Sequence, residues 1–167
     1  MDINFIELKK ITDYHIEMIK EFFNFHRRLT EAKGKYLMSF ETAKETLNDW
    51  LKENIFRIII VDEKEVGFIY YKTGGQDFAW LEDIFILEEY RGKGYGKKIV
   101  NKFFDVIKAS GVVSCVVNVI PRNEAAIKFY ISCGFDHLNM IELRVNFDKS
   151  FDKDDEIEVL GHKVYKY

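Results

Sequence analysis

The feature that most constrains this chain is a glycine-rich hexapeptide, Arg91-Gly92-Lys93-Gly94-Tyr95-Gly96. It lies between an apolar run at residues 80–87, typical of a strand, and a helix-like run at residues 97–109. Three glycines at alternate positions permit positive φ and leave no side chain above the backbone. Such a turn directs backbone N–H groups and the positive end of the following helix at one point. The hexapeptide therefore predicts a phosphate cradle, to which Arg91 and Lys93 add positive charge.

Several nucleotide-binding motifs share this physics, and the spacing distinguishes between them. The Gly-Lys-Ser/Thr ending of a P-loop is missing. The spacing G-x-G-x-G also differs from the G-x-G-x-x-G fingerprint of dinucleotide-binding domains. Read as Arg-x-x-Gly-x-Gly, the hexapeptide resembles the pyrophosphate loop of the GNAT N-acetyltransferase superfamily, which binds acetyl-coenzyme A.

Two further blocks, one on each side of the loop, strengthen this resemblance. Downstream, Asn123 opens a short helix, Ala125 follows two residues later, and Tyr130 lies near the helix end before a Gly-Phe pair. This set is similar to the second GNAT signature. Upstream, the segment Leu81-Glu82-Asp83-Ile84-Phe85-Ile86 resembles the strand that precedes the loop in this superfamily. The chain is identified as a member of the GNAT superfamily, with the resemblance covering residues 55–147.

The hydrophobic pattern agrees with the fold that the resemblance implies, an α/β fold of the mixed α+β kind. We expect strands at residues 3–9, 55–61, 66–71, 80–87 and 112–120 and a final pair of strands at 135–147. We expect a first helix that Thr12 or Asp13 caps and that runs to about Leu29, further helices at 39–51 and 97–109, and a short helix after Asn123. This order forms a mixed, mostly antiparallel central sheet with helices on both faces. A hairpin around Gly161 would add a C-terminal β extension.

Length and composition fit one globular domain. We expect a single N-acetyltransferase domain over residues 1–167, with a coenzyme-binding core at about 78–135 and the extension at about 148–167. The formal net charge of −3 provides no electrostatic basis for binding nucleic acid. No signal peptide or long apolar run is present, so we expect a cytoplasmic protein that does not bind membranes.

The histidines and cysteines predict neither a metal site nor a nucleophile. The four histidines are scattered, with no acid or cysteine at ligand spacing. Cys115 lies in an apolar strand and Cys133 at a helix end, where we expect buried thiols. Neither lies in a constellation with a histidine, so acetyl transfer is expected to be direct, without an acyl-enzyme.

The resemblance implies how acetyl-coenzyme A, the expected cosubstrate, is held. Its pyrophosphate would lie on the cradle of Arg91, Gly92, Lys93, Gly94, Tyr95 and Gly96. Its pantetheine arm would pair with main-chain atoms of Ile84, Phe85 and Ile86. Asn123, which can also cap its helix, and Tyr130 would complete the coenzyme site.

Glu82 is the candidate catalytic base, since related enzymes carry an acid in this segment. An alkyl amine has a pKa near 10.4, so keeping it neutral at pH 7 costs about 4–5 kcal/mol, and a carboxylate at the site helps it lose its proton. Strand alternation places Glu82 on the face of Trp80 and Ile84, and Asp83 on the other. A β-bulge in this strand would exchange the two faces, so Asp83 is the alternative base. A structural salt bridge or a position on an exposed strand face is the other interpretation of Glu82.

Tyr130 is the candidate catalytic acid. A phenol with a pKa near 10 can protonate a leaving thiolate at modest cost. Helical spacing also permits a packed core tyrosine, and the match of the whole signature favours the catalytic role.

The acceptor is the least determined part of the prediction. We expect a primary amine on a small molecule, such as a polyamine, an amino acid derivative or an aminoglycoside-like compound. A protein N-terminus or lysine is the alternative acceptor, and a non-catalytic acyl-coenzyme A binding module is the alternative function. The C-terminal hairpin is either an added edge, a homodimer contact or a lid on the substrate site, and the sequence leaves these open.

Overall fold

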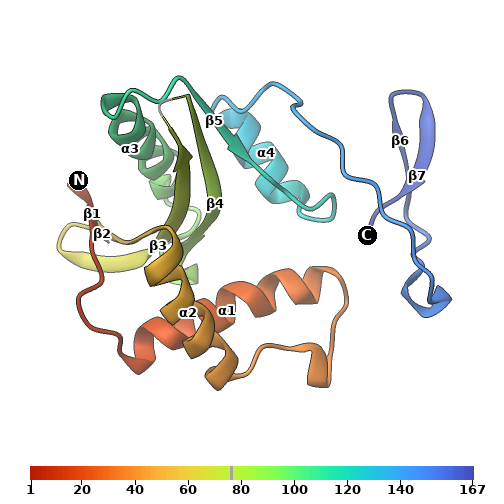
Figure 1. Cartoon of the computed structure of the whole chain (residues 1–167), viewed down its shortest axis with the longest axis horizontal. Coiled ribbons are helices and arrows are strands. Elements are labelled where there is room, and N and C mark those ends of the chain that lie inside the picture. Colours follow the sequence, from red (N-terminus) through yellow and green to blue (C-terminus); the bar gives the residue numbers. More distant parts are fainter. Residues whose placement is uncertain (76) are drawn as a thin grey trace. The chain divides into compact units, whose positions relative to one another are not determined.

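The computed structural model describes residues 1–75 and 77–167, which form two compact units, Met1–Asn118 and Val119–Tyr167 (Figure 1). The first unit holds the central sheet, the glycine-rich loop and three α-helices. The second holds one α-helix and a hairpin. The predicted order of strands and helices is confirmed from the first strand to the helix after Asn123.

The first unit is built on a five-stranded sheet in which the strand order follows the chain. The strands are β1 (Ile3–Ile6), β2 (Ile55–Val61), β3 (Lys64–Gly74), β4 (Phe78–Ile86) and β5 (Ser114–Val117). Strands β1 to β4 pair antiparallel, whereas β5 runs parallel to β4. The predicted mixed, mostly antiparallel sheet is therefore confirmed, although β5 is shorter than expected.

Helices cover both faces of this sheet. The longer ones are α1 (Asp13–Leu29), α2 (Phe40–Glu53) and α3 (Tyr95–Ala109), and the short 3-10 turns are η1 (Gly34–Tyr36) and η2 (Glu88–Tyr90). The adjacent residues Tyr70 and Tyr71 of β3 point to opposite faces, as strand geometry requires. Tyr70 stacks on Trp50 of α2 with ring centroids 4.4 Å apart, and Tyr71 contacts Phe103 of α3 at 5.0 Å.

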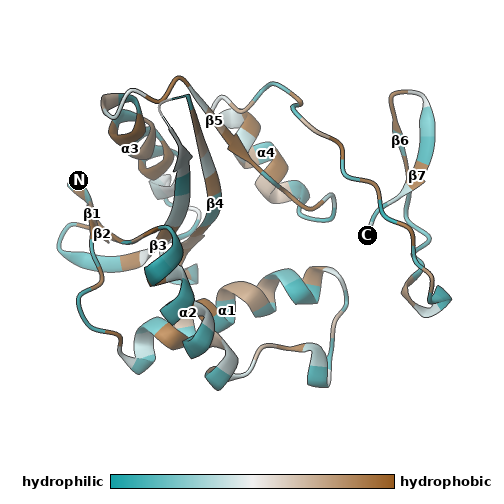
Figure 2. Cartoon of the chain, viewed as in Figure 1, coloured by the Kyte–Doolittle hydropathy of each residue, from teal (hydrophilic) through white to brown (hydrophobic). Residues whose placement is uncertain are grey.

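Helix α2 starts where the sequence supplies a side-chain cap, and α1, α2 and α3 each bury apolar residues. Ser39 caps α2 by accepting a hydrogen bond from the Thr42 backbone N–H at 3.1 Å. Figure 2 shows hydrophobic and hydrophilic residues interleaved along α1 and α2, as amphipathic helices require. Among the described residues, no helix combines the length and the apolar character needed to cross a bilayer.

An aromatic cluster fills the layer between the sheet and the helices α1 and α2. It joins Phe22 of α1 and Trp50 of α2 to Phe68 of β3 and Phe85 of β4, all of them buried. The Phe22 ring lies edge-on to both Phe68, at 5.4 Å, and Phe85, at 6.0 Å. Because Phe85 belongs to this cluster, the end of β4 that leads into the glycine-rich loop is packed against α1 and the core.

The second unit contains α4 (Glu124–Ser132), the short η3 (Lys149–Phe151) and a hairpin of β6 (Glu156–Val159) and β7 (His162–Tyr165). The strands pair antiparallel, and the two turn residues Leu160 and Gly161 have φ values of 50° and 81°. Two consecutive positive φ angles are typical of the type I′ turns that suit hairpins. The predicted C-terminal β extension is confirmed.

The prediction of two strands at residues 135–147 is wrong. This stretch contains no strand in the structure, although its last part alternates apolar and polar residues. Leu143 is 75% exposed and Phe147 is 92% exposed. Alternation indicates only that a segment can extend, whereas a strand also needs a neighbour whose N–H and C=O groups bond to its own. No such ladder is present at residues 135–147.

Candidate active site

The backbone of β4 carries one extra residue, and that residue is Glu82. On β3, Tyr71 faces Leu81 and the next residue, Tyr70, faces Asp83, so Glu82 has no opposite residue of its own. This is a β-bulge. Residues directly opposite in a ladder share a face, so Leu81 stays with Tyr71 on the α3 side while Asp83 joins Tyr70 on the α1–α2 side.

Glu82 is held by an ion pair with Lys72 of β3. Lys72 faces Trp80 across the ladder, and its ammonium lies 5.5 Å from the centroid of the Trp80 ring. Lys72 is two residues from Tyr70 and therefore points to the same side of the sheet. The bulge thus brings Glu82 and Asp83 to the α1–α2 face together, whereas regular alternation would have separated them.

Burial and the neighbouring carboxylate change the acidity of Asp83. Burial, followed by the negative charge of Glu82, raises the pKa of Asp83 to about 7. Burial also raises the pKa of Tyr70, and the charges of Glu82 and Asp83 add to this effect against an opposing hydrogen bond from Asn54. A half-buried carboxyl group with a pKa near neutrality can exchange protons with an amine at physiological pH.

Beyond the bulge, one edge of β4 is open. The ladder between β4 and β5 covers only Phe78 to Leu81. On the other edge, pairing with β3 continues to Ile86, which faces Gly67. A Cβ at Gly67 would lie 1.9 Å from the carbonyl oxygen of Phe85, so this close pairing requires glycine. The predicted coenzyme residues Ile84, Phe85 and Ile86 therefore lie where β4 has a strand partner on only one side among the described residues.

The glycine-rich loop has the geometry of an anion cradle. Gly92 and Gly94 have φ values of 70° and 76°, and Gly94 is the N-cap residue of α3. A Cβ built on either glycine would have no atom within 4 Å, so the space above the backbone is open. The N–H groups of the first helical turn, which includes Tyr95 and Gly96, have no acceptor within a helix. The loop thus fits a pyrophosphate group.

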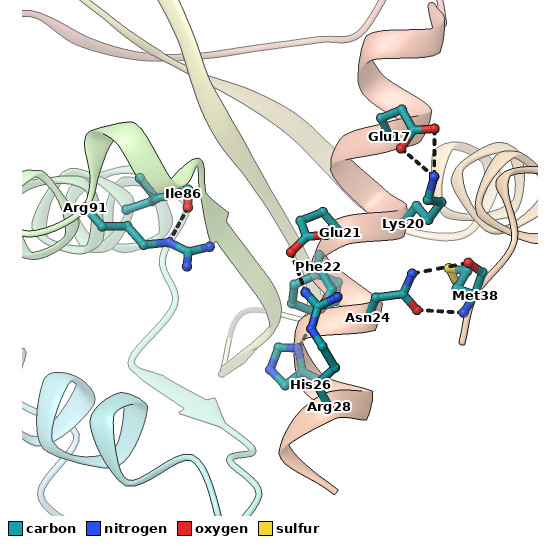
Figure 3. Close-up of polar contacts among 10 residues, drawn as sticks. All are labelled: Glu17, Lys20, Glu21, Phe22, Asn24, His26, Arg28, Met38, Ile86 and Arg91. Carbon is teal, nitrogen blue, oxygen red and sulfur yellow. Dashed lines mark hydrogen bonds and ion pairs between the residues drawn. The ribbon is translucent and has the colours of Figure 1, made fainter. Parts of the chain in front are cut away.

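Arg91 turns back from this loop toward the end of β4. Its Nε donates a hydrogen bond to the carbonyl oxygen of Ile86 at 2.7 Å (Figure 3). Its guanidinium group lies 5.0 Å from the centroid of the Phe85 ring and 5.5 Å from that of Phe25 on α1. Arg91 therefore joins the loop, the open edge of β4 and α1. The role of Phe25 could not be predicted from the sequence, because no local pattern relates α1 to the loop.

A buried hydrogen-bonded pair fixes the connection between α1 and α2. The Asn24 side chain donates to the carbonyl oxygen of Met38 at 3.2 Å and accepts from its backbone N–H at 2.6 Å (Figure 3). A hollow of about 750 Å³ lies on this connection and is lined by Arg28, Glu31, Ala32, Lys33, Gly34 and Leu37. It does not include Glu82 or Asp83. An asparagine among the apolar residues of α1 was the one signal that could have identified this contact.

Asn123 and Tyr130 belong to the second unit. Asn123 is 9% exposed and caps α4, because its side-chain oxygen accepts from the Ala126 backbone N–H at 3.2 Å. Tyr130 lies in the last turns of this helix, with its ring edge-on to Phe135 at 5.5 Å. The predicted capping role of Asn123 is confirmed, whereas the coenzyme and catalytic roles stay predictions.

The other candidate groups are placed as follows. Burial raises the pKa of the Cys115 thiol to about 11, so this residue is protonated at neutral pH and is a poor nucleophile. Within the described part of the chain, no three His, Cys, Asp or Glu side chains cluster as metal ligands would.

Comparison with known proteins assigns the family. Residues 19–135 match the sequence model of the acetyltransferase (GNAT) family. The chain belongs to this family. GNAT acetyltransferases use acetyl-coenzyme A, and the glycine-rich loop at the start of α3 fits the pyrophosphate of that cosubstrate.

Individual GNAT relatives match over different lengths. The mouse thialysine N-epsilon-acetyltransferase is 32% identical over 80 residues, 48% of this chain and 46% of that protein, so the chain spans about half the length of this curated relative. The crystal structure of the acetyltransferase YycN from Bacillus subtilis has a TM-score of 0.66 at 18% identity and covers 88% of this chain and 100% of its own. The PaiA N-acetyltransferase of Thermoplasma acidophilum, solved with coenzyme A, has a TM-score of 0.60 at 21% identity, over 80% of this chain and 89% of its own.

We expect Gly94→Val to abolish the thermal stabilisation that coenzyme A gives the wild-type protein, because the new side chain would occupy the open space above the loop. A ligand at 100 times its dissociation constant adds about 2.7 kcal/mol of stability. The matched control is Gly111→Val, just after α3, where φ is 88° and the space is equally open. Both variants pay about 1–2 kcal/mol for the left-handed conformation. Differential scanning fluorimetry compares them, and a normal coenzyme shift in Gly94→Val would contradict the cradle.

Proposed function

We propose that this protein transfers the acetyl group of acetyl-coenzyme A to a primary amine of a small molecule. The observation that carries the proposal is the bulged strand β4. Within nine residues, this strand combines a carboxyl group titrating near neutrality with an open edge, and it leads directly into the cradle loop. The carboxylate that would accept the proton of the acceptor amine and the main-chain groups that would bind the thioester arm therefore lie on the same strand.

The loop and β4 would hold the coenzyme largely through main-chain atoms. Gly92, Lys93, Gly94, Tyr95 and Gly96 would bind the pyrophosphate, and the main chain of Ile84, Phe85 and Ile86 would bind the pantetheine arm. Asn123 would contribute at the start of α4. When bound, acetyl-coenzyme A supplies the acetyl thioester, which is the electrophile of the reaction.

We assign the role of catalytic base to Asp83. Glu82 is the neighbour whose charge helps to raise the pKa of Asp83. A proton passing from an alkyl ammonium to an ordinary aspartate must overcome about 6 pKa units, or roughly 9 kcal/mol, whereas a carboxylate of pKa about 7 reduces this cost to roughly 5 kcal/mol. Glu82 is engaged by Lys72, and its charge helps to keep the pKa of Asp83 raised. The proton would pass from the amine to the carboxylate of Asp83, directly or through a water.

The acceptor is proposed to be a small amine of the amino acid type. This class is supported by the local similarity to an enzyme named for the N-epsilon group of thialysine. Transfer would be direct, because burial raises the pKa of the Cys115 thiol to about 11 and the other cysteine, Cys133, is itself buried.

An amine panel tests the function. Purified protein with acetyl-coenzyme A should release free thiol in the presence of at least one amino acid-type or polyamine acceptor. Lysine-containing peptides and a protein N-terminal peptide form the comparison set. Turnover of peptides alone would contradict the small-molecule acceptor, and binding of coenzyme without turnover of any amine would contradict catalysis.

We expect the kcat/KM of the wild-type protein to rise as the pH passes through about 7, because Asp83 accepts a proton only as the carboxylate. Asp83→Asn should remove this rise from the pH profile and lower kcat/KM at pH 7 by about 10²–10⁴-fold. High pH should restore part of the rate, since solvent then supplies the neutral amine. Glu82→Gln is the matched control. It should keep the rise of kcat/KM but move it to lower pH, because removing the neighbouring negative charge lowers the pKa of Asp83. If Glu82→Gln loses the rise of kcat/KM with pH while Asp83→Asn keeps it, Glu82 is the base.

Tyr130 is proposed to protonate the leaving thiolate through its hydroxyl group. We expect Tyr130→Phe to keep the affinity for coenzyme A, measured by calorimetry, and to lower kcat by about 10²–10⁴-fold. The loss should fall on kcat because the hydroxyl is needed only once charge develops on the thiolate sulfur. An unchanged kcat, in single-turnover experiments that isolate the chemical step, would make Tyr130 a packing residue.

A further inference from the structure

Two ion pairs flank Asn123 in the sequence, and both connect it to the C-terminal hairpin. The Arg122 guanidinium lies 2.7 Å from a carboxylate oxygen of Asp155, and the Lys166 ammonium lies 2.6 Å from a carboxylate oxygen of Glu124. Asp155 immediately precedes β6 and Lys166 immediately follows β7. The residues before and after Asn123 are therefore bound to the two ends of the same hairpin.

The base of the hairpin is itself closed by hydrogen bonds. The Lys166 backbone N–H donates to the carbonyl oxygen of Asp155 at 2.9 Å. Arg122 donates a further hydrogen bond to the carbonyl oxygen of Lys166 at 3.3 Å. The Arg122 side chain is only 13% exposed whereas that of Asp155 is 53% exposed, so the pair is shielded from water on the Arg122 side.

Neither partner of this contact is a stable structure by itself. Helix α4 has nine residues, fewer than an isolated helix needs to persist in water. A two-stranded hairpin with strands of four residues is likewise marginal alone. Contacts that join them therefore stabilise both, and the place of contact is the first turn of α4, where Asn123 acts as the cap.

We propose that the C-terminal hairpin is a positioning clamp for the start of α4, in which Arg122 and Glu124 hold the Asn123 cap through Asp155 and Lys166. The clamp rests on the proposed function, since Asn123 and Tyr130 are the residues through which α4 would serve the coenzyme site. By fixing the first turn of a helix this short, the hairpin also fixes the orientation of Tyr130 on its last turns. The hairpin thus acts on coenzyme binding through α4.

The test is the double variant Asp155→Asn with Lys166→Gln, which removes both charges from the hairpin. The matched control is Glu156→Gln, which breaks the 2.9 Å pair between Glu156 and Lys163 within the same hairpin. Hydrogen exchange of the α4 amides, followed by mass spectrometry, measures the clamp itself. Calorimetric titration with coenzyme A measures its effect on binding.

The double variant should exchange its α4 amides at least about tenfold faster than the wild-type protein and bind coenzyme A about three- to thirtyfold more weakly. The control should match the wild-type protein in both measurements.

A reversed pair, Arg122→Asp with Asp155→Arg, should recover protection of α4, which excludes general misfolding as the cause. Unchanged exchange in the double variant would overturn the clamp, and faster exchange with unchanged coenzyme affinity would overturn the positioning role. Failure of the wild-type protein to bind coenzyme A would instead overturn the proposed function, while the exchange measurement would still decide the clamp.

Discussion

The extra residue that β4 carries at Glu82 is the constraint on which the candidate site depends. A regular strand would place Asp83 on the same face as Leu81, against the apolar side chains of α3. The bulge turns Asp83 toward Tyr70 and the aromatic cluster of α1 and α2, and it leaves Glu82 beside Lys72. Two carboxylates thus reach the face of the sheet that packs against α1 and α2.

The acidity of Asp83 is the direct consequence of that placement. A half-buried carboxylate next to a second negative charge is disfavoured, and the raised pKa of Asp83 expresses this cost. The polar neighbours of Asp83 have partners of their own: Lys72 pairs with Glu82, and Asn54 donates a hydrogen bond to the Tyr70 hydroxyl. A carboxyl group that is largely withdrawn from water beside a second carboxylate departs from the usual polarity of a strand interior. Such departures are typical of functional sites.

The coenzyme side of the site depends on backbone geometry more than on side chains. Gly67 permits the close pairing of β3 with the end of β4, and β5 leaves the other edge of β4 open after Leu81. Gly94 then starts α3 in a left-handed conformation that few other residues adopt. Arg91, expected at the phosphate, binds the Ile86 carbonyl and stacks between the end of β4 and α1, a contact that only the folded chain could reveal.

Local patterns in the sequence determined the cradle loop, the caps at Ser39 and Asn123, the order of elements as far as α4 and the hairpin around Gly161, because each depends on residues a few positions apart. The strands expected at residues 135–147 did not form, since alternation cannot supply the partner strand that a ladder requires. Tertiary structure alone decided that β4 bulges at Glu82, that Asp83 titrates near neutrality and that residues flanking Asn123 bind the chain's last hairpin. These features depend on burial, on strand register and on charges far apart in the sequence, and no local pattern encodes them.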